Sequence, residues 1–219
     1  ITSGLQRVST SLRMIPIKQA FQRMSRLIRD LAKDSGKQIA VDLVGEDTEI
    51  DRNMVDEIYN PLVHLVRNAV DHGLETPEER LAAGKPEKGL IKLKAYHRGG
   101  NIVIEIADDG RGLNREKILR KAINNHLVAD GEGLSDLEIY RLILLPGLST
   151  AEKITDVSGR GVGMDVVKQA VDRLRGKIEI DSTPGRGTTF ITSFPLTMAI
   201  IDGMIVKVGP QRYILPTTA

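Results

Sequence analysis

Hydrophobic residues recur at helical spacing along several stretches of the chain. Over residues 16–35 they fall three or four positions apart, and Gly36 follows, which predicts a helix that ends at the glycine. A second helix is predicted over residues 51–73, where Asp51 is a suitable N-cap. Pro61 lies inside this segment and predicts a kink, because its ring clashes with the preceding turn.

Capping residues predict further helices. Asn114 is an N-cap signal for a helix that ends near residue 125, and Ser135 with Glu138 has the spacing of a capping box. A last helix is predicted over residues 164–175, ended by Gly176. The Gly-, Ser- and Thr-rich stretch before it has no periodicity, and a loop of this length in a compact domain usually has a function or is disordered.

Alternating apolar and polar residues predict strands. Residues 39–44 form one, and residues 90–96 and 101–107 form a hairpin around an Arg-Gly-Gly-Asn turn. Residues 177–181 and 188–194 form another pair, joined by Thr-Pro-Gly-Arg-Gly. Helices interleaved with such strands predict a two-layer α/β sandwich with a mixed, largely antiparallel sheet.

The two ends of the chain differ from this middle domain, which we assign to residues 17–196. Residues 1–16 begin inside a helical pattern without a start signal, and they are expected to be the end of a helix. Residues 197–219 read as a strand, a Gly-Pro turn and a second strand, which predicts a C-terminal β-hairpin that belongs to a further β domain.

Composition excludes several classes of protein. With 31 basic and 29 acidic residues the net charge is +2, and aromatic residues make up 3%, so no nucleic-acid partner is expected. The absence of cysteine excludes disulfides and suits the reducing cytoplasm, where we expect the protein. No apolar run approaches the roughly 20 residues that span a bilayer, so direct membrane insertion is not expected.

The polar side of the helix predicted over residues 51–73 carries unusual chemistry. At about 100° per residue, His64, Asn68, Asp71 and His72 fall on one stripe opposite an apolar face. These side chains bind metal ions, phosphate or protons. A lone helical histidine is more often structural, and zinc is a rival ligand, but no His-Glu-x-x-His or cysteine supports zinc. An asparagine among them suits Mg²⁺.

Two glycine-rich motifs follow. In Asp108-Asp-Gly-Arg-Gly the glycines allow a close approach of the backbone, and the carboxylate at the strand end can accept a hydrogen bond from an exocyclic amine, although Asp-Gly is also a common turn. Gly159-Arg-Gly-Val-Gly precedes a helix start at Met164, where free N–H groups bind phosphate, although a flexible linker has the same composition. Lys117 and Lys121 either neutralise phosphate or are solvated surface.

The order of these motifs resembles the ATP-binding domain of histidine kinases, within the group that includes gyrase B, Hsp90 and MutL. The strings Pro61-Leu-Val-His-Leu-Val-Arg-Asn-Ala-Val-Asp-His-Gly and Val157-Ser-Gly-Arg-Gly-Val-Gly-Met-Asp-Val-Val carry the resemblance, which is strongest for the chemotaxis type. It implies a Bergerat ATP-binding fold with ATP and Mg²⁺ as ligands.

The resemblance also implies the site residues. Asn68 would coordinate Mg²⁺, Asp108 would accept from the adenine amine, and His72 would approach the phosphates, with Asp71 in support. The other expected ATP-binding residues are Gly110 and Gly112 in the turn, Lys117 and Lys121 near the phosphates, Ser149, Gly159, Arg160, Gly161, Gly163 and Met164 in the lid and phosphate contacts, and Thr189 in the pocket wall.

His64 is the expected catalytic residue, since the ATP-hydrolysing members of the group have a glutamate at this position. An imidazole there activates the incoming histidine or only holds Asn68 and a metal-bound water in place. The rival functions are an ATPase clamp of the gyrase, Hsp90 and MutL class and a scaffold without nucleotide binding.

The same resemblance implies partners. A separate phosphotransfer domain of the same kinase would carry the phospho-accepting histidine in trans. Residues 1–16 would be the end of a dimerisation helix in a homodimer, and residues 197–219 the start of a regulatory domain that docks a coupling protein and chemoreceptors.

Overall fold

A computed structural model describes residues 13–148, 163–196, 203–208 and 211–216. Its centre is a five-stranded sheet in the order β2-β4-β5-β7-β6, in which β2 and β4 run parallel and all other neighbours antiparallel. The predicted mixed, largely antiparallel sheet is confirmed. In sheet order the strands are β2 (Ile39–Val44), β4 (Gly89–Arg98), β5 (Asn101–Asp108), β7 (Gly187–Pro195) and β6 (Lys177–Thr183).

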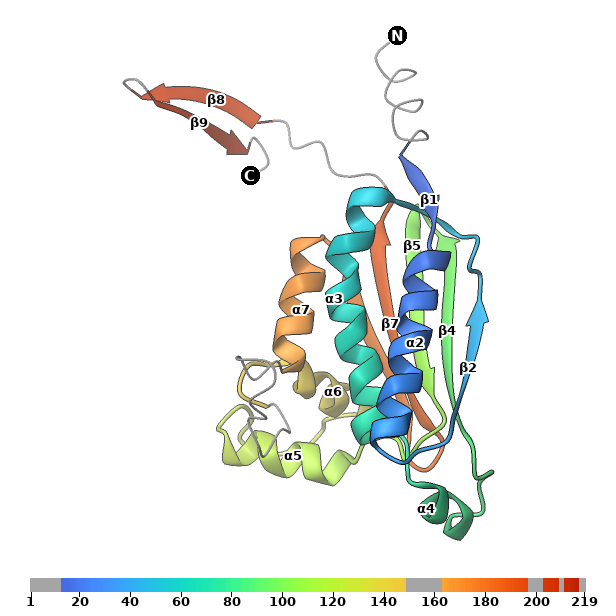
Figure 1. Cartoon of the computed structure of the whole chain (residues 1–219). Helices are drawn as coiled ribbons and strands as arrows, with labels where there is room; N and C mark the ends of the chain where they lie inside the picture. The colour runs from blue at the N-terminus through green and yellow to red at the C-terminus, as the bar shows by residue number, and fades with distance from the viewer. Residues whose placement is uncertain (1–12, 149–162, 197–202, 209–210, 217–219) are drawn as a thin grey trace.

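Three helices cover one face of this sheet, which makes the two-layer α/β sandwich (Figure 1). They are α2 (Lys18–Asp34), α3 (Arg52–Asn68) and α7 (Met164–Arg173). Short helical segments lie toward one end of the sheet: η1 (Ala69–Gly73), α4 (Pro77–Ala82), α5 (Arg115–Asn124), α6 (Asp136–Arg141) and η2 (Leu142–Leu144).

Local signals explain most of these boundaries. The Asp51 carboxylate accepts from the N–H of Asn53 at the start of α3, and Asn114 caps α5 in the same way. Ser135 and Glu138 form the predicted capping box of α6. Gly99 and Gly100 both have positive φ, which the tight turn between β4 and β5 requires.

The core lies between the helices and the covered face of the sheet. Ile58, Leu62 and Val66 of α3 are fully buried, as the helical spacing predicted. Ile104 and Ile106 of β5 meet them from the sheet. The polar stripe of α3 is therefore held by packing on the opposite side of the helix.

The predicted helix over residues 51–73 is correct in extent but not uniform in type. It continues through Pro61 as an α-helix to Asn68 and then widens into a π-helix, η1, in which the N–H of Leu74 donates to the carbonyl of Ala69 at 2.8 Å. Such wide turns often occur at functional sites.

The N-terminal expectation is wrong where the structure describes it. Met14–Pro16 form a short strand, β1, instead of the end of a helix, and pair with β3 (Glu49–Asp51). The residues before Arg13 lie outside the described part. At the other end the predicted hairpin is confirmed as β8 (Gly203–Val208) paired with β9 (Gln211–Pro216).

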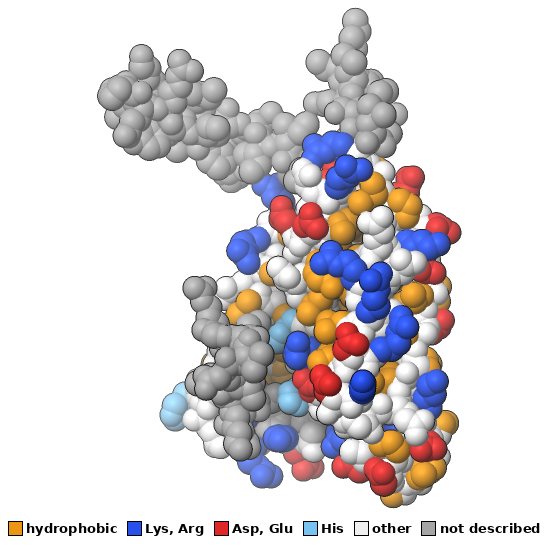
Figure 2. All heavy atoms as spheres, viewed as in Figure 1, with side chains coloured by type: hydrophobic (Ala, Val, Ile, Leu, Met, Phe, Trp, Pro, Cys, Tyr) orange, Lys and Arg blue, Asp and Glu red, His pale blue; other side chains and the backbone are white. Residues whose placement is uncertain are grey.

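Basic side chains follow the outer side of α2, with hydrophobic and acidic side chains beside them on this face of the molecule (Figure 2). Arg23, Arg26, Arg29 and Lys33 are all exposed there, and the Arg23 guanidinium lies 4.0 Å from the ring centroid of Tyr59. None of the helices in the described ranges combines the length and apolar character needed to cross a bilayer.

Candidate nucleotide-binding site

Asp108 ends β5, and its side chain points to the helix-covered face at the end of the sheet. The residue is only 9% exposed, and its Oδ1 accepts a hydrogen bond from the N–H of Gly110 at 2.9 Å. Burial raises the pKa of Asp108 to about 6, against hydrogen bonds from the backbone N–H groups of Gly110 and Thr188. The carboxylates of Asp109 and Glu75 raise it further. Asp108 is thus an oriented acceptor in a largely desolvated position.

The turn after Asp108 packs directly on the end of η1. The N–H of Arg111 donates to the carbonyl of Gly73 at 2.9 Å, and a Cβ on Gly110 would lie 2.1 Å from that carbonyl oxygen. Gly112 has a φ of +72°, and a Cβ there would lie 2.5 Å from the Thr183 carbonyl oxygen. Both glycines are therefore required by close backbone approach.

The polar stripe of α3 faces the start of α7. Asn68 Nδ2 lies 3.0 Å from Met164 Sδ, so the residues predicted to bind the metal and the phosphates are adjacent. Burial lowers the pKa of His64, and the positive charges of Arg67 and His72 lower it further. The carboxylate of Asp165, at the start of α7, raises this pKa. The structure brings Asn68 and Met164 into contact, and His64 lies close enough to Asp165 for the charge of that carboxylate to act on its imidazole.

The wide turn η1 displays Asp71 and His72. Both are exposed, and Lys37 from the loop after α2 donates to the backbone carbonyls of Val70 and Asp71. Burial lowers the pKa of Lys37. Lys37 thus holds the backbone of η1 in place, and no motif in the sequence predicted this contact.

The N-terminus of α7 has the features of an anion site. Gly163 is the N-cap residue in extended conformation, and no side chain caps the first turn. The N–H of Val166 donates to the Gly163 carbonyl at 3.2 Å, whereas the N–H groups of Met164 and Asp165 at the start of the helix have no intrahelical acceptor and suit an oxyanion. Ser149, Gly159, Arg160 and Gly161, which the sequence assigns to the same site, lie outside the described residues.

The predicted lysines both lie on α5. Ile118 and Ala122 bury one side of this helix, Lys117 is exposed and Lys121 is partly exposed. The helix follows the Asp108 turn directly, so the two side chains lie on the element next to the expected base site.

The structure places Thr188 rather than Thr189 beside Asp108. Asp108 pairs with Thr188 across β5 and β7, and directly opposed residues point to the same face of a sheet. Thr189 pairs with Ala107 and points to the other face. Thr188 is 5% exposed, and its hydroxyl lies 3.1 Å from Ser182 Oγ. The register between β5 and β7 identifies Thr188, and this register could not be predicted from the sequence.

Sequence reasoning also missed a buried charged cluster next to the Asp108 turn. Arg80 is 1% exposed and forms ion pairs with Glu75 and Asp109, and Lys85 binds Glu75 as well. The only signal in the sequence was the capping box of α4, in which Thr76 and Glu79 bond reciprocally.

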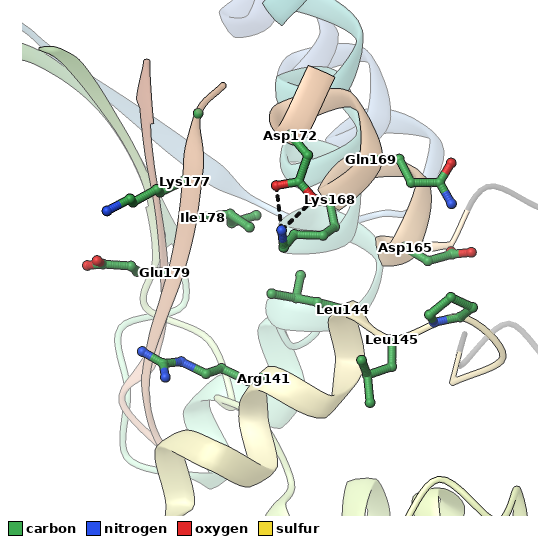
Figure 3. Close-up of a pocket in the computed structure, with 12 residues that line it drawn as sticks. Arg141, Leu144, Leu145, Asp165, Lys168, Gln169, Asp172, Lys177, Ile178 and Glu179 are labelled. Atoms are coloured by element: carbon green, nitrogen blue, oxygen red, sulfur yellow. Dashed lines mark hydrogen bonds and ion pairs between the residues drawn. The ribbon is translucent and has the colours of Figure 1, made fainter. Parts of the chain in front are cut away.

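A separate groove of about 530 Å³ lies between α6, η2, α7 and the edge strand β6 (Figure 3). Leu144, Leu145 and Ile178 form its apolar part, and Lys168 and Asp172 make an ion pair along α7. Of the predicted site residues that the structure describes, none lines this groove, so we do not assign the nucleotide to it.

The zinc alternative finds no support in the geometry. Among the residues that the structure describes, no three His, Asp or Glu side chains come close enough together to hold a metal ion.

The chain is similar to known proteins. Residues 57–198 match the family model described as histidine kinase-, DNA gyrase B- and HSP90-like ATPase. The chain is 52% identical to the chemotaxis protein CheA of Rhizobium meliloti over 219 residues, all of this chain and 29% of that protein. It is 52% identical to CheA of Salmonella typhimurium, over 98% of this chain and 32% of that protein, and 45% identical to CheA of Bacillus subtilis, over 100% and 33%.

Among solved structures, the catalytic domain of the histidine kinase ThkA aligns with a TM-score of 0.48 and 15% identity, over 84% of this chain and 95% of that one. The chain spans about a third of the length of the curated relatives that it matches. It belongs to the family of histidine kinase-, DNA gyrase B- and HSP90-like ATPases.

Proposed function

We propose that this domain binds Mg-ATP and transfers the γ-phosphoryl group to a histidine on a separate phosphotransfer domain of the same kinase, in bacterial chemotaxis signalling. The observation that carries the proposal is the adjacency of Asn68 on α3 and Met164 at the uncapped start of α7, with the buried Asp108 at the end of β5. The 45–52% identity to the three chemotaxis proteins supports the same reaction.

The residues at hand fit Mg-ATP. The Asp108 carboxylate accepts from the N–H groups of Gly110 and Thr188, and its remaining lone pairs can accept from the exocyclic amine of adenine. Asn68 supplies a hard oxygen ligand for Mg²⁺, and the first turn of α7 supplies N–H donors for phosphate oxygens. Bound Mg-ATP supplies the phosphoryl group, which leaves through a loose transition state.

His64 is proposed as the general base. Its lowered pKa keeps the imidazole neutral at physiological pH, so it can accept the proton of the attacking histidine. Asp165 lies close enough to influence its charge and would stabilise the imidazolium after proton transfer. In the alternative role, His64 only orients Asn68. His64→Ala with unchanged ATP affinity and unchanged transfer rate would contradict the base role.

The larger assembly is also a proposal. Residues 17–196 would be the catalytic domain, the residues that precede strand β1 the end of a dimerisation helix of a homodimer, and residues 197–219 the start of a regulatory domain for a coupling protein and chemoreceptors. The pairing of β8 with β9 suits the start of a β domain. We place the protein in the cytoplasm, in keeping with the absence of cysteine.

The test is transfer of label from γ-labelled Mg-ATP to a separately supplied histidine phosphotransfer domain of a chemotaxis kinase. We expect label on that domain that is stable in base and labile in acid, and its loss with Asn68→Ala. Release of free phosphate at the same rate with and without the acceptor would instead favour an ATPase clamp.

A further inference from the structure

The turn that carries Asp108 is held from outside by a buried arginine, Arg80, and a half-buried lysine, Lys85. Arg80 ends in a bidentate contact with the Asp109 carboxylate, at 3.0 Å and 2.8 Å, and its Nε donates to the Pro86 carbonyl at 2.7 Å. A guanidinium that is 1% exposed must have all its donors satisfied, because an unpaired buried charge is costly. Arg80 therefore fixes Asp109 to the segment after α4.

Lys85 holds the same turn by its backbone. Its Nζ donates to the carbonyl of Gly110 at 2.7 Å, to the carbonyl of Asp109 at 3.0 Å and to Glu75 Oε1 at 2.8 Å. These three bonds use all the donors of an ammonium group. The Gly110 N–H, at the other side of the same residue, is the one that orients Asp108 Oδ1.

Charge couples this cluster to Asp108 as well as geometry. The charged groups around Asp108 are Asp109 on its own turn, Glu75 after η1, and Arg80 and Lys85 from α4 and the segment that follows it. β7 contributes the uncharged N–H of Thr188. Asp109 and Glu75 both oppose ionisation of Asp108, and the two cations neutralise them.

We propose that Arg80 and Lys85 are positioning residues for base recognition, which hold the turn from Asp108 to Gly110 so that Asp108 accepts from the exocyclic amino group of adenine. The proposal rests on the proposed ATP site. It assigns to this buried cluster a role in choosing the nucleotide, in addition to any role in stability.

The test compares two nucleotides that differ only in that amino group. The selectivity is the Kd of purine riboside triphosphate divided by the Kd of ATP, both with excess Mg²⁺, measured by calorimetry from pH 5.5 to 8. Titration of the phosphates cancels in this ratio. In the unchanged chain we expect the ratio to fall as the pH drops through the pKa of Asp108, about 6.

For Lys85→Met we expect the selectivity at pH 7.5 to fall about tenfold, the size of one charge-assisted hydrogen bond. The Kd of purine riboside triphosphate should change less than about twofold. The pH at which the selectivity decreases should move to a higher value, because the loss of a cation raises the pKa of Asp108. Lys85→Arg should restore part of the selectivity. The matched control is Lys88→Met, which removes an exposed lysine from the same segment.

A second variant guards against loss of folding. Glu75→Gln removes one anion near Asp108 and keeps an oxygen that can accept from Lys85. The pH at which the selectivity decreases should therefore move to a lower value. Unchanged selectivity and pH profile in both variants, or equal weakening of both nucleotides by Lys85→Met, would overturn the proposal. If the unchanged chain binds neither nucleotide, the proposed function itself fails.

Discussion

Replacement of Asp108 by asparagine should make the domain more stable at neutral pH and worse at binding ATP. Burial raises the pKa of Asp108 from 3.8 to about 6, a difference of about 2 units. Each unit corresponds to about 1.4 kcal/mol, so the ionised carboxylate costs the folded state about 3 kcal/mol.

The sign follows from proton binding. Because the folded state binds the proton more tightly than the unfolded state, the contribution of Asp108 to the free energy of unfolding falls as the pH rises from about 4 to about 6 and stays low above that. Asparagine does not titrate. Its NH2 group would face the N–H of Gly110 or Thr188, so one hydrogen bond would be lost. The free-energy cost of that lost hydrogen bond does not vary with pH.

The assay is urea denaturation of both chains from pH 4 to 7.5. The free energy of unfolding of Asp108→Asn, minus that of the unchanged chain, should rise by about 3 kcal/mol over this range. Asp181→Asn, which removes an exposed carboxylate on β6, is the matched control for the change in net charge. A flat or falling difference for Asp108→Asn would refute the assignment of Asp108 as a buried, desolvated carboxylate.

Three further changes test the packing around the site. Thr188→Ala should weaken ATP binding about tenfold in calorimetry, and Thr189→Ala should leave it unchanged, because only Thr188 shares a face of the sheet with Asp108. Equal effects of the two substitutions would contradict the register between β5 and β7. Gly110→Ala should lower the free energy of unfolding by roughly 1–3 kcal/mol in urea, because the new Cβ would meet the Gly73 carbonyl; wild-type stability would contradict this contact. Leu62→Ala should cost roughly 2–5 kcal/mol in the same assay, as for a fully buried leucine, and a loss below about 1 kcal/mol would contradict the core assignment.

Local patterns were enough to predict much of the fold. The hairpin of β4 and β5 follows from alternation and from two glycines that reach positive φ, and the cap of α6 follows from Ser135 and Glu138. The stripe of His64 and Asn68 follows from helical geometry, which depends only on neighbours along the chain.

Contacts between distant segments were not predictable in this way. The π-helix η1 is held by Lys37 from the loop after α2, and the choice of Thr188 over Thr189 depends on the register between β5 and β7. Arg80 looks like a surface residue in the sequence, because nothing local shows that it meets Asp109 29 positions away. Met14–Pro16 became a strand through pairing with β3.

The most direct test of the central claim is calorimetric titration of the chain with Mg-ATP and with metal-free ADP. The account predicts one site in which Asp108→Ala weakens both ligands at least about tenfold, because the base side is shared, whereas Asn68→Ala weakens Mg-ATP strongly and metal-free ADP little. Unchanged affinity for Mg-ATP in both variants would contradict the claim that α3, β5 and α7 form a single nucleotide site.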